Sequence, residues 1–189
     1  MSRAYRIAVK ESIKRVVRAR DHVSTQLEIL GILPQEQMAE LLAQELQKRG
    51  FKQKGKQLVR QEKGVTVAVD AETGTVTVQS ELEQDVQIEG ERVGRSYDDS
   101  GPGAKKVRAD LSKELRDDLE KQVQERAEKL QGEATDKLEA ELGDLRGELN
   151  QVVNKVTAEA LKQKAGQMGQ IKEMTEDPQS GALTIVVEV

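Results

Sequence analysis

The sequence has no cysteine and no tryptophan, and it contains one histidine in 189 residues. Thiol chemistry, disulfides and cysteine zinc sites are therefore excluded, and so is any catalytic relay or metal site that needs several histidines. The lone His22 follows Asp21, and we predict that it is a turn residue. One Phe and two Tyr leave almost no rings on which nucleic-acid bases could stack.

Long apolar runs are also missing, since no stretch approaches the roughly 18 residues that a membrane-spanning helix needs. The opening MSRAYRIAVK alternates like a strand and does not resemble a signal peptide, so we expect a cytoplasmic protein. Hydrophobic residues make up 36% and charged residues 34% of the chain, which predicts a small core. The net charge of −4 gives no overall reason to expect a polyanionic partner.

The common catalytic motifs are absent from the sequence. It contains no P-loop, no GxGxxG after a strand, no GxSxG, no HExxH and no clustered metal ligands. Asp98 and Asp99 are adjacent carboxylates, but a glycine-rich linker lacks the burial that tunes a catalytic pKa. We therefore predict that the protein is not an enzyme and has neither a cofactor nor a bound metal.

Alternating apolar residues predict three N-terminal strands, at 5–10, 13–20 and 23–29, joined as an antiparallel meander. Its exposed face carries a basic row: Lys10, Lys14, Arg18 and Arg20. This row is a candidate anion contact, as in a weak nucleic-acid-binding module. Strands also carry such residues on the solvent side to prevent edge pairing, and that interpretation is favoured.

The rest of the sequence predicts an α+β fold in which an antiparallel sheet of hairpins carries one short packed helix. Residues 34–49 are amphipathic and begin with Pro34, as expected of a helix. Two valine-rich runs around Gly74 predict a β-hairpin, with Gly74 at positive φ. The predicted domains are 1–97 (sheet domain), 98–104 (flexible linker), 105–166 (helical arm) and 167–189 (C-terminal hairpin). Because an isolated hairpin is too small to fold alone, we expect it to return and pair with the N-terminal sheet.

The helical arm is either one long helix or a helical hairpin. An apolar stripe runs at spacings of four up to Leu130 and then alternates between four and three. Gly132 lies where the spacing changes, so we favour an interruption there. The second part of the stripe consists of Leu138, Leu142, Leu145, Leu149, Val152 and Val156.

If the arm is one helix, this stripe needs a second chain to cover it; if the arm folds back, the stripe is internal core. We take the six stripe residues as a hypothetical partner-binding surface. The function predicted from these residues is that of a non-catalytic interaction protein or adaptor. A self-associating structural protein that dimerises through the arm is the first alternative, and a weak nucleic-acid-binding module is the second.

Four segments carry a resemblance to a known family: SRAYRIAVKESIKRVV, LEILGILPQEQMAELLAQEL, GVTVAVDAETGTVTV and GQIKEMTEDPQSGALTIVVEV. Together they resemble small bacterial accessory proteins of ternary systems, in which an FtsH-like AAA+ ATPase is encoded with a MoxR-type ATPase and a von Willebrand A protein. The resemblance implies an accessory or adaptor role beside ATP-driven remodelling machinery. It assigns no functional residue.

Overall fold

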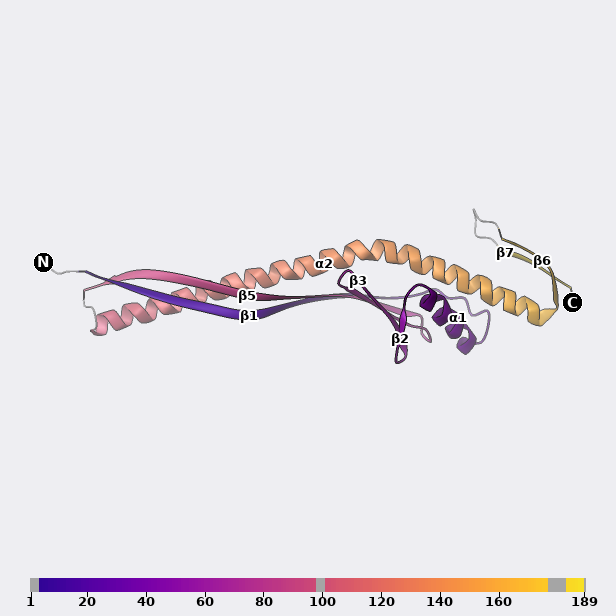
Figure 1. The fold of residues 1–189 in the computed structure, drawn as a ribbon, viewed down its shortest axis with the longest axis horizontal. Coiled ribbons are helices and arrows are strands. Elements are labelled where there is room, and N and C mark those ends of the chain that lie inside the picture. The colour runs from indigo at the N-terminus through magenta and orange to yellow at the C-terminus, as the bar shows by residue number, and fades with distance from the viewer. Residues whose placement is uncertain (1–3, 98–100, 177–182, 189) are drawn as a thin grey trace. The chain divides into compact units, whose positions relative to one another are not determined.

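The computed structural model describes residues 4–97, 101–176 and 183–188, and it has the predicted α+β class (Figure 1). A five-stranded antiparallel sheet, a short helix and a long helix precede a final hairpin. The elements are β1 (Tyr5–Gln26), α1 (Gln35–Lys48), β2 (Lys52–Lys54), β3 (Gln57–Glu62), β4 (Val65–Asp70), β5 (Thr75–Ser96), α2 (Pro102–Met168), β6 (Gln170–Glu176) and β7 (Leu183–Glu188).

The strands of the large sheet lie in the order β1-β5-β4-β3-β2. The predicted hairpin around Gly74 is confirmed, because β4 and β5 pair antiparallel with Val69 opposite Val76. Gly74 has a φ of 71° and donates its N–H to the Asp70 carbonyl at 2.8 Å. Only glycine adopts such a conformation without strain, so Gly74 closes the turn.

The predicted N-terminal meander is wrong, because β1 is one strand of 22 residues. Neither residues 11–12 nor Asp21 and His22 form a turn, and His22 lies inside the strand. The segment contains no glycine and no proline, and its apolar alternation continues across both predicted turns. Without such a residue the chain has no local reason to reverse.

Residues 102–168 form one continuous helix, so the favoured interruption at Gly132 is also wrong. A single glycine costs only about 1 kcal/mol relative to alanine in a helix interior. Apolar packing on both sides of Gly132 outweighs that cost, because Leu130 and Ala134 are both buried. The helix begins at Pro102, inside the predicted linker 98–104, whose residues 98–100 lie outside the described residues.

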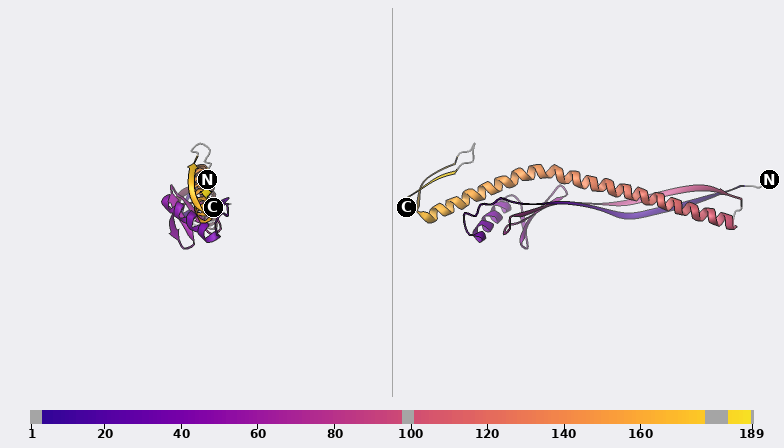
Figure 2. Two further views of the ribbon diagram at one scale, coloured as in Figure 1. Left: turned by 90° about the vertical axis from the view of Figure 1, so that its right-hand side faces the viewer. Right: turned by 180° about the vertical axis from the view of Figure 1, so that it is seen from behind.

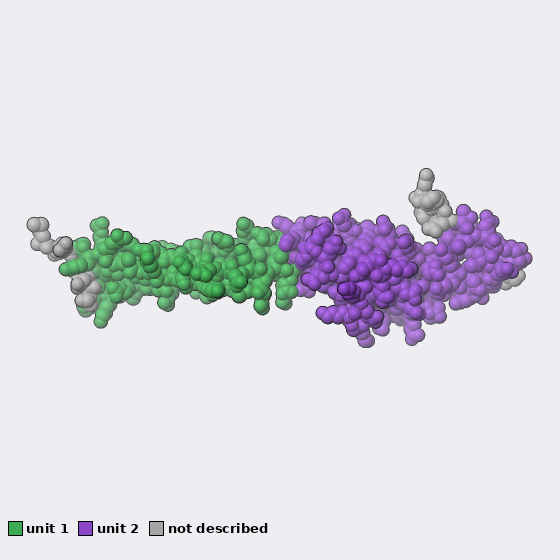
Figure 3. All heavy atoms as spheres, in the orientation of Figure 1, with its two compact units in different colours: residues 1–20, 81–135 green, residues 21–80, 136–189 purple. Residues whose placement is uncertain are grey.

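The chain consists of two compact units (Figure 3). Unit 1 comprises residues 1–20 and 81–135, and unit 2 comprises residues 21–80 and 136–189. In unit 1, β1 and β5 run side by side, as the right-hand view of Figure 2 shows, and α2 covers one face of the pair. Most buried apolar residues of unit 1 fall into two small clusters: Val17, Ala19, Val86, Val123, Leu130 and Ala134 in one, and Val9, Leu115 and Leu119 in the other.

Glycine allows α2 to approach β5 closely in unit 1. A Cβ on Gly90 would lie 2.8 Å from Leu115 Cδ1, and one on Gly94 would lie 2.9 Å from Leu111 Cδ1. Real Cβ atoms do not approach so closely, so these positions face the helix and favour glycine.

Unit 2 has a larger core, formed by α1, α2 and the strands β3, β4 and β5. Its fully buried members include Leu42 and Leu46 of α1 and Val69 and Val76 of the sheet. The single phenylalanine, Phe51, is buried in the same cluster. The short helix therefore packs as the amphipathic pattern of 34–49 predicted.

The prediction that the C-terminal hairpin pairs with the N-terminal sheet is wrong. Within the described residues, β6 and β7 form their own two-stranded sheet and do not join the five-stranded one. The two strands pair antiparallel with each other, from Gln170 opposite Glu188 to Glu176 opposite Leu183. The predicted acidic turn, residues 177–182, and Val189 lie outside the described residues.

Candidate interaction surfaces

The apolar stripe predicted to bind a partner is part of the core of unit 2. Five of its six side chains, all except Leu142, are buried, with Val152 at 0% exposure, and Leu142 is partly buried against the same cluster. The chain's own sheet and α1 cover the stripe, so it is not free to receive another chain. Helical periodicity shows that a face is apolar, but it cannot show which part of which chain covers it.

The basic row on β1 faces acidic residues on β5, in unit 1. Lys10 Nζ lies 3.4 Å from Glu91 Oε2, Arg18 Nε lies 2.8 Å from Glu83 Oε2, and Arg20 hydrogen-bonds Glu81 through Nε at 2.8 Å. These ion pairs largely neutralise the row, which therefore offers little positive charge to phosphates. The sequence signal was available, since the three glutamates occupy odd-numbered positions of one strand and therefore share a face.

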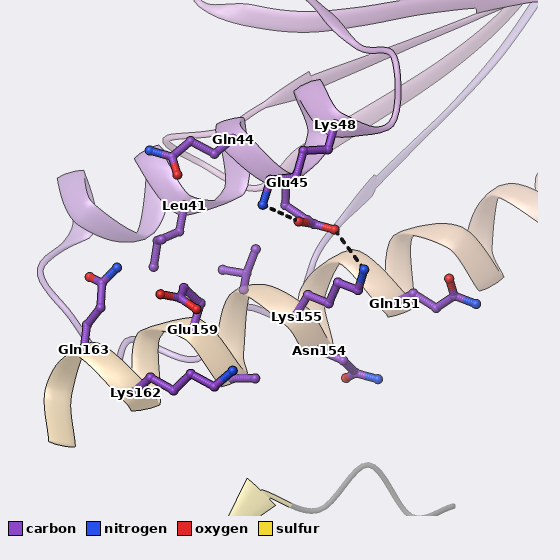
Figure 4. A pocket seen from close by; sticks show the side chains of 12 residues that line it. Leu41, Gln44, Glu45, Lys48, Gln151, Asn154, Lys155, Glu159, Lys162 and Gln163 are labelled. Atoms are coloured by element: carbon purple, nitrogen blue, oxygen red, sulfur yellow. Dashed lines mark hydrogen bonds and ion pairs between the residues drawn. The ribbon is translucent and has the colours of Figure 1, made fainter. Parts of the chain in front are cut away.

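A polar groove of about 780 Å³ separates α1 from α2 in unit 2 (Figure 4). Glu45 is one of the residues that line it and forms ion pairs with Lys48, Arg49 and Lys155, at 3.3 to 3.6 Å. Burial raises the pKa of Glu45, but the hydrogen bonds from Lys48 and Arg49 and the charge of Lys155 outweigh it and lower the pKa. Of these three ion pairs, only the one with Lys155 joins α1 to α2, because Lys48 and Arg49 lie at the end of α1 itself.

Arg60 forms a second polar contact of unit 2, on β3. Its Nη1 and Nη2 donate to the two carboxylate oxygens of Glu148 on α2, at 2.8 and 2.6 Å. The guanidinium also stacks on the Phe51 ring, 4.6 Å from its centroid, and donates to the Arg49 carbonyl at 3.1 Å. The bidentate pair joins the sheet to α2. Among the described residues, the buried Arg60 Nε has no hydrogen-bond partner and lies 3.8 Å from Glu62 Oε2.

A groove of about 870 Å³ with polar and apolar lining residues lies between the end of β1 and α2, also in unit 2. Its floor is formed by Val76, Val78, Leu145 and Leu149, and Val23 of β1 stands at its edge with 40% exposure. On the helix side, Arg146, Asn150 and Asn154 follow one another at intervals of four and so line one flank. The groove thus combines an apolar floor with polar helix side chains beside a sheet edge.

Exposed apolar side chains gather at the C-terminal end of the chain. Leu161, Met168, Ile171, Met174 and Val186 are each between 37% and 61% exposed. The hairpin thus leaves apolar side chains in contact with solvent.

The face of unit 1 that points away from α2 carries two arginines, Arg6 and Arg95, that have no carboxylate partner within residues 4–97, 101–176 and 183–188. Because Gly90 and Gly94 face α2, the intervening positions 93 and 95 of β5 face away from it. The ion pairs between β1 and β5 join residues 10 with 91, 18 with 83 and 20 with 81. The same register places Arg6 opposite Arg95.

No carboxylate among the described residues pairs with Arg6 or Arg95. Tyr97, directly after β5, is 81% exposed, and Val93 is 46% exposed. We call Arg6, Val93, Arg95 and Tyr97 the Arg–Tyr face. The sequence alone does not reveal this face, because it forms only where the start of β1 lies beside the end of β5.

No group of three or more potential metal ligands occurs within residues 4–97, 101–176 and 183–188. In the same residues, no helix is sufficiently long and apolar to cross a lipid bilayer.

The structure defines an α+β protein with a five-stranded antiparallel sheet, one short helix and one long helix. The family described as FtsH ternary system domain X5 matches the chain over residues 1–189, so the chain belongs to that family. This confirms the resemblance noted in the four sequence segments. No curated protein and no solved structure was found to match the chain.

Proposed function

We propose that this protein is a non-catalytic accessory subunit that binds another protein of an FtsH ternary system through the Arg–Tyr face. The observation that carries the proposal is the placement of Arg6 opposite Arg95. Like charges directly opposite each other destabilise a sheet, whereas the same two strands match basic with acidic residues elsewhere. A negatively charged partner surface would remove this cost.

The residue types of this face also favour a protein partner. Tyrosine and arginine are enriched at the energetic centres of protein interfaces, where a ring supplies contact area and a guanidinium binds carboxylates. Tyr97 and Arg95 are two residues apart on one exposed face. The other two functions predicted from sequence have less support, because the arm's stripe is internal and the basic row is ion-paired.

The test is an affinity pull-down of the tagged full-length chain from cells that express the other proteins of its system, at moderate salt. We expect the wild-type chain to retain an ATPase or the von Willebrand A protein in near-stoichiometric amount. Arg95→Glu should abolish this retention. The same substitution should not weaken the fold, because the introduced carboxylate would lie opposite Arg6 and attract it.

Lys14→Glu is the matched control, since it reverses a charge on the same face of β1 and lies outside the Arg–Tyr face. It should leave retention unchanged. Retention of the partner by Arg95→Glu would refute this face as the binding surface. A wild-type chain that retains none of the system's proteins would refute the accessory role itself.

A further inference from the structure

The segments of unit 1 that lie nearest the start of α2 are rich in basic residues. The sequence of residues 1–8 and 93–113 includes the start of β1, the end of β5 and the start of α2. It contains seven basic and three acidic residues, although the whole chain has a net charge of −4. A local excess of positive charge on an acidic chain attracts negatively charged partners to this end of the unit.

Three of these cations stand at the start of α2. Lys105, Lys106 and Arg108 are exposed, and no carboxylate within residues 4–97, 101–176 and 183–188 forms an ion pair with them. The first turn of α2 contains no acidic residue. Because the start of a helix carries partial positive charge, acidic side chains are favoured there and basic ones are not. The three cations therefore repel the helix terminus, and a partner that brings carboxylates would offset this cost.

The start of α2 lies against the end of β5. A Cβ on Gly94 would lie 3.2 Å from Val107 Cγ1, and Ala104 is only 2% exposed. Arg95 directly follows Gly94 in β5. The cations of α2 and the Arg–Tyr face are therefore neighbours at the same end of unit 1.

The cations of this end do not share one plane. The two arginines of the Arg–Tyr face lie on the side of the strands that points away from α2. Lys105 and Lys106 lie about 100° and 200° round the helix from the buried Ala104, and Arg108 lies about 40° from it. A flat or rigid partner could reach only part of this set, whereas an extended chain segment can pass round the end and meet the cations in turn.

We propose that this end of unit 1 binds an extended acidic segment of the partner protein, an inference that rests on the proposed function. Carboxylates form charge-assisted hydrogen bonds with arginine and lysine, and flexible segments can wrap a large surface. The cations that meet the carboxylates are Arg6, Arg95, Lys105, Lys106 and Arg108.

The placement of the two tyrosines favours an acidic peptide over a nucleic acid. Tyr5 alternates with the buried Ile7 and so lies on the side of β1 that faces α2. Tyr97 belongs to the opposite face and is 81% exposed. Rings on opposite faces cannot form the stacking platform on which successive bases bind.

A fluorescently labelled oligo-glutamate peptide, titrated with the full-length chain at low salt, tests this proposal by anisotropy. We expect saturable binding that weakens steeply as salt is added, because exposed ion pairs are screened. Lys105→Glu/Lys106→Glu should weaken the binding by about tenfold. Acidic side chains are favoured at the start of a helix, so this double variant should keep the circular dichroism spectrum of the wild type.

Lys121→Glu/Lys129→Glu is the matched control. It makes the same change of net charge on the same helix in unit 1, at two exposed lysines far from the helix start. It should bind the peptide as the wild type does. Equal losses in the two double variants, or a wild-type chain that does not bind the peptide, would overturn the proposal. Tighter binding of an oligothymidylate strand of the same charge would overturn it in favour of a nucleic acid.

The pull-down that tests the proposed function also separates the two proposals. We expect Lys105→Glu/Lys106→Glu to lose the same partner protein that Arg95→Glu loses. If Arg95→Glu lost the partner while Lys105→Glu/Lys106→Glu retained it, the acidic segment would not reach α2, and the accessory function would stand. A wild-type chain that retained no protein of the system would refute the accessory function, whereas the peptide titration would still decide whether this end binds acidic segments.

Discussion

Arg60 connects three parts of unit 2 through contacts of different kinds: a bidentate ion pair with Glu148, a stacking contact with Phe51 and a hydrogen bond to a backbone carbonyl. The hydrogen bonds from Arg60, together with its charge and that of Arg49, lower the pKa of Glu148 despite the opposing effect of partial burial. The carboxylate therefore stabilises the fold while it is ionised.

Glu148→Gln should lower the free energy of unfolding by about 2 kcal/mol at pH 7, the usual value of a hydrogen-bonded charge pair of this kind. Because the folded pKa lies below the ordinary value of 4.5, this stabilisation is fully present above about pH 4.5 and is lost as the pH falls through the folded pKa. Chemical denaturation of both chains between pH 7 and pH 3 measures the difference. Glu139→Gln, an exposed carboxylate of the same helix, is the control and should show almost no difference at any pH.

At the scale of the elements, much of the fold could be predicted from sequence. The amphipathic helix 34–49 and the hairpin around Gly74 depend on local patterns, and both were correct. The length of β1 was not, because a pair such as Asp21-His22 favours a turn only weakly when no glycine or proline is present. The Arg–Tyr face and the groove depend on residues distant in sequence, so no local pattern could reveal either.

The continuity of α2 gives a prediction at the same scale. Gly132 lies within the helix, and a Cβ at that position would meet no atom within 4 Å. Gly132→Ala should therefore raise the free energy of unfolding by about 0.5–1 kcal/mol, because alanine is the better helix former. Thermal or urea denaturation measures this gain. Gly74→Ala, at a positive φ, should destabilise and serves as the contrast. A loss of stability in Gly132→Ala would mean that the helix is interrupted there after all.

The whole molecule has two cores of unequal size. The buried cluster of unit 2 has 17 members, including the single phenylalanine, whereas the two clusters of unit 1 have six and three. Less buried apolar area gives less stabilisation, so unit 1 should open at a lower free energy than unit 2. Hydrogen exchange should show this as weaker amide protection in residues 81–96 than in residues 65–70.

A core substitution in unit 2 tests whether the two units open independently. Leu42 is 0% exposed, so Leu42→Ala should cost about 2–5 kcal/mol of local stability. We expect the amide protection of β3, β4 and α1 against hydrogen exchange to fall steeply. The amides of unit 1 should exchange at an unchanged rate, because they already exchange through a local opening of unit 1 that costs less free energy. Val123→Ala, in the core of unit 1, should have the reverse effect. If either substitution accelerated exchange equally in both units, the cores would unfold as one cooperative structure, and β1, β5 and α2 would transmit stability along their whole length.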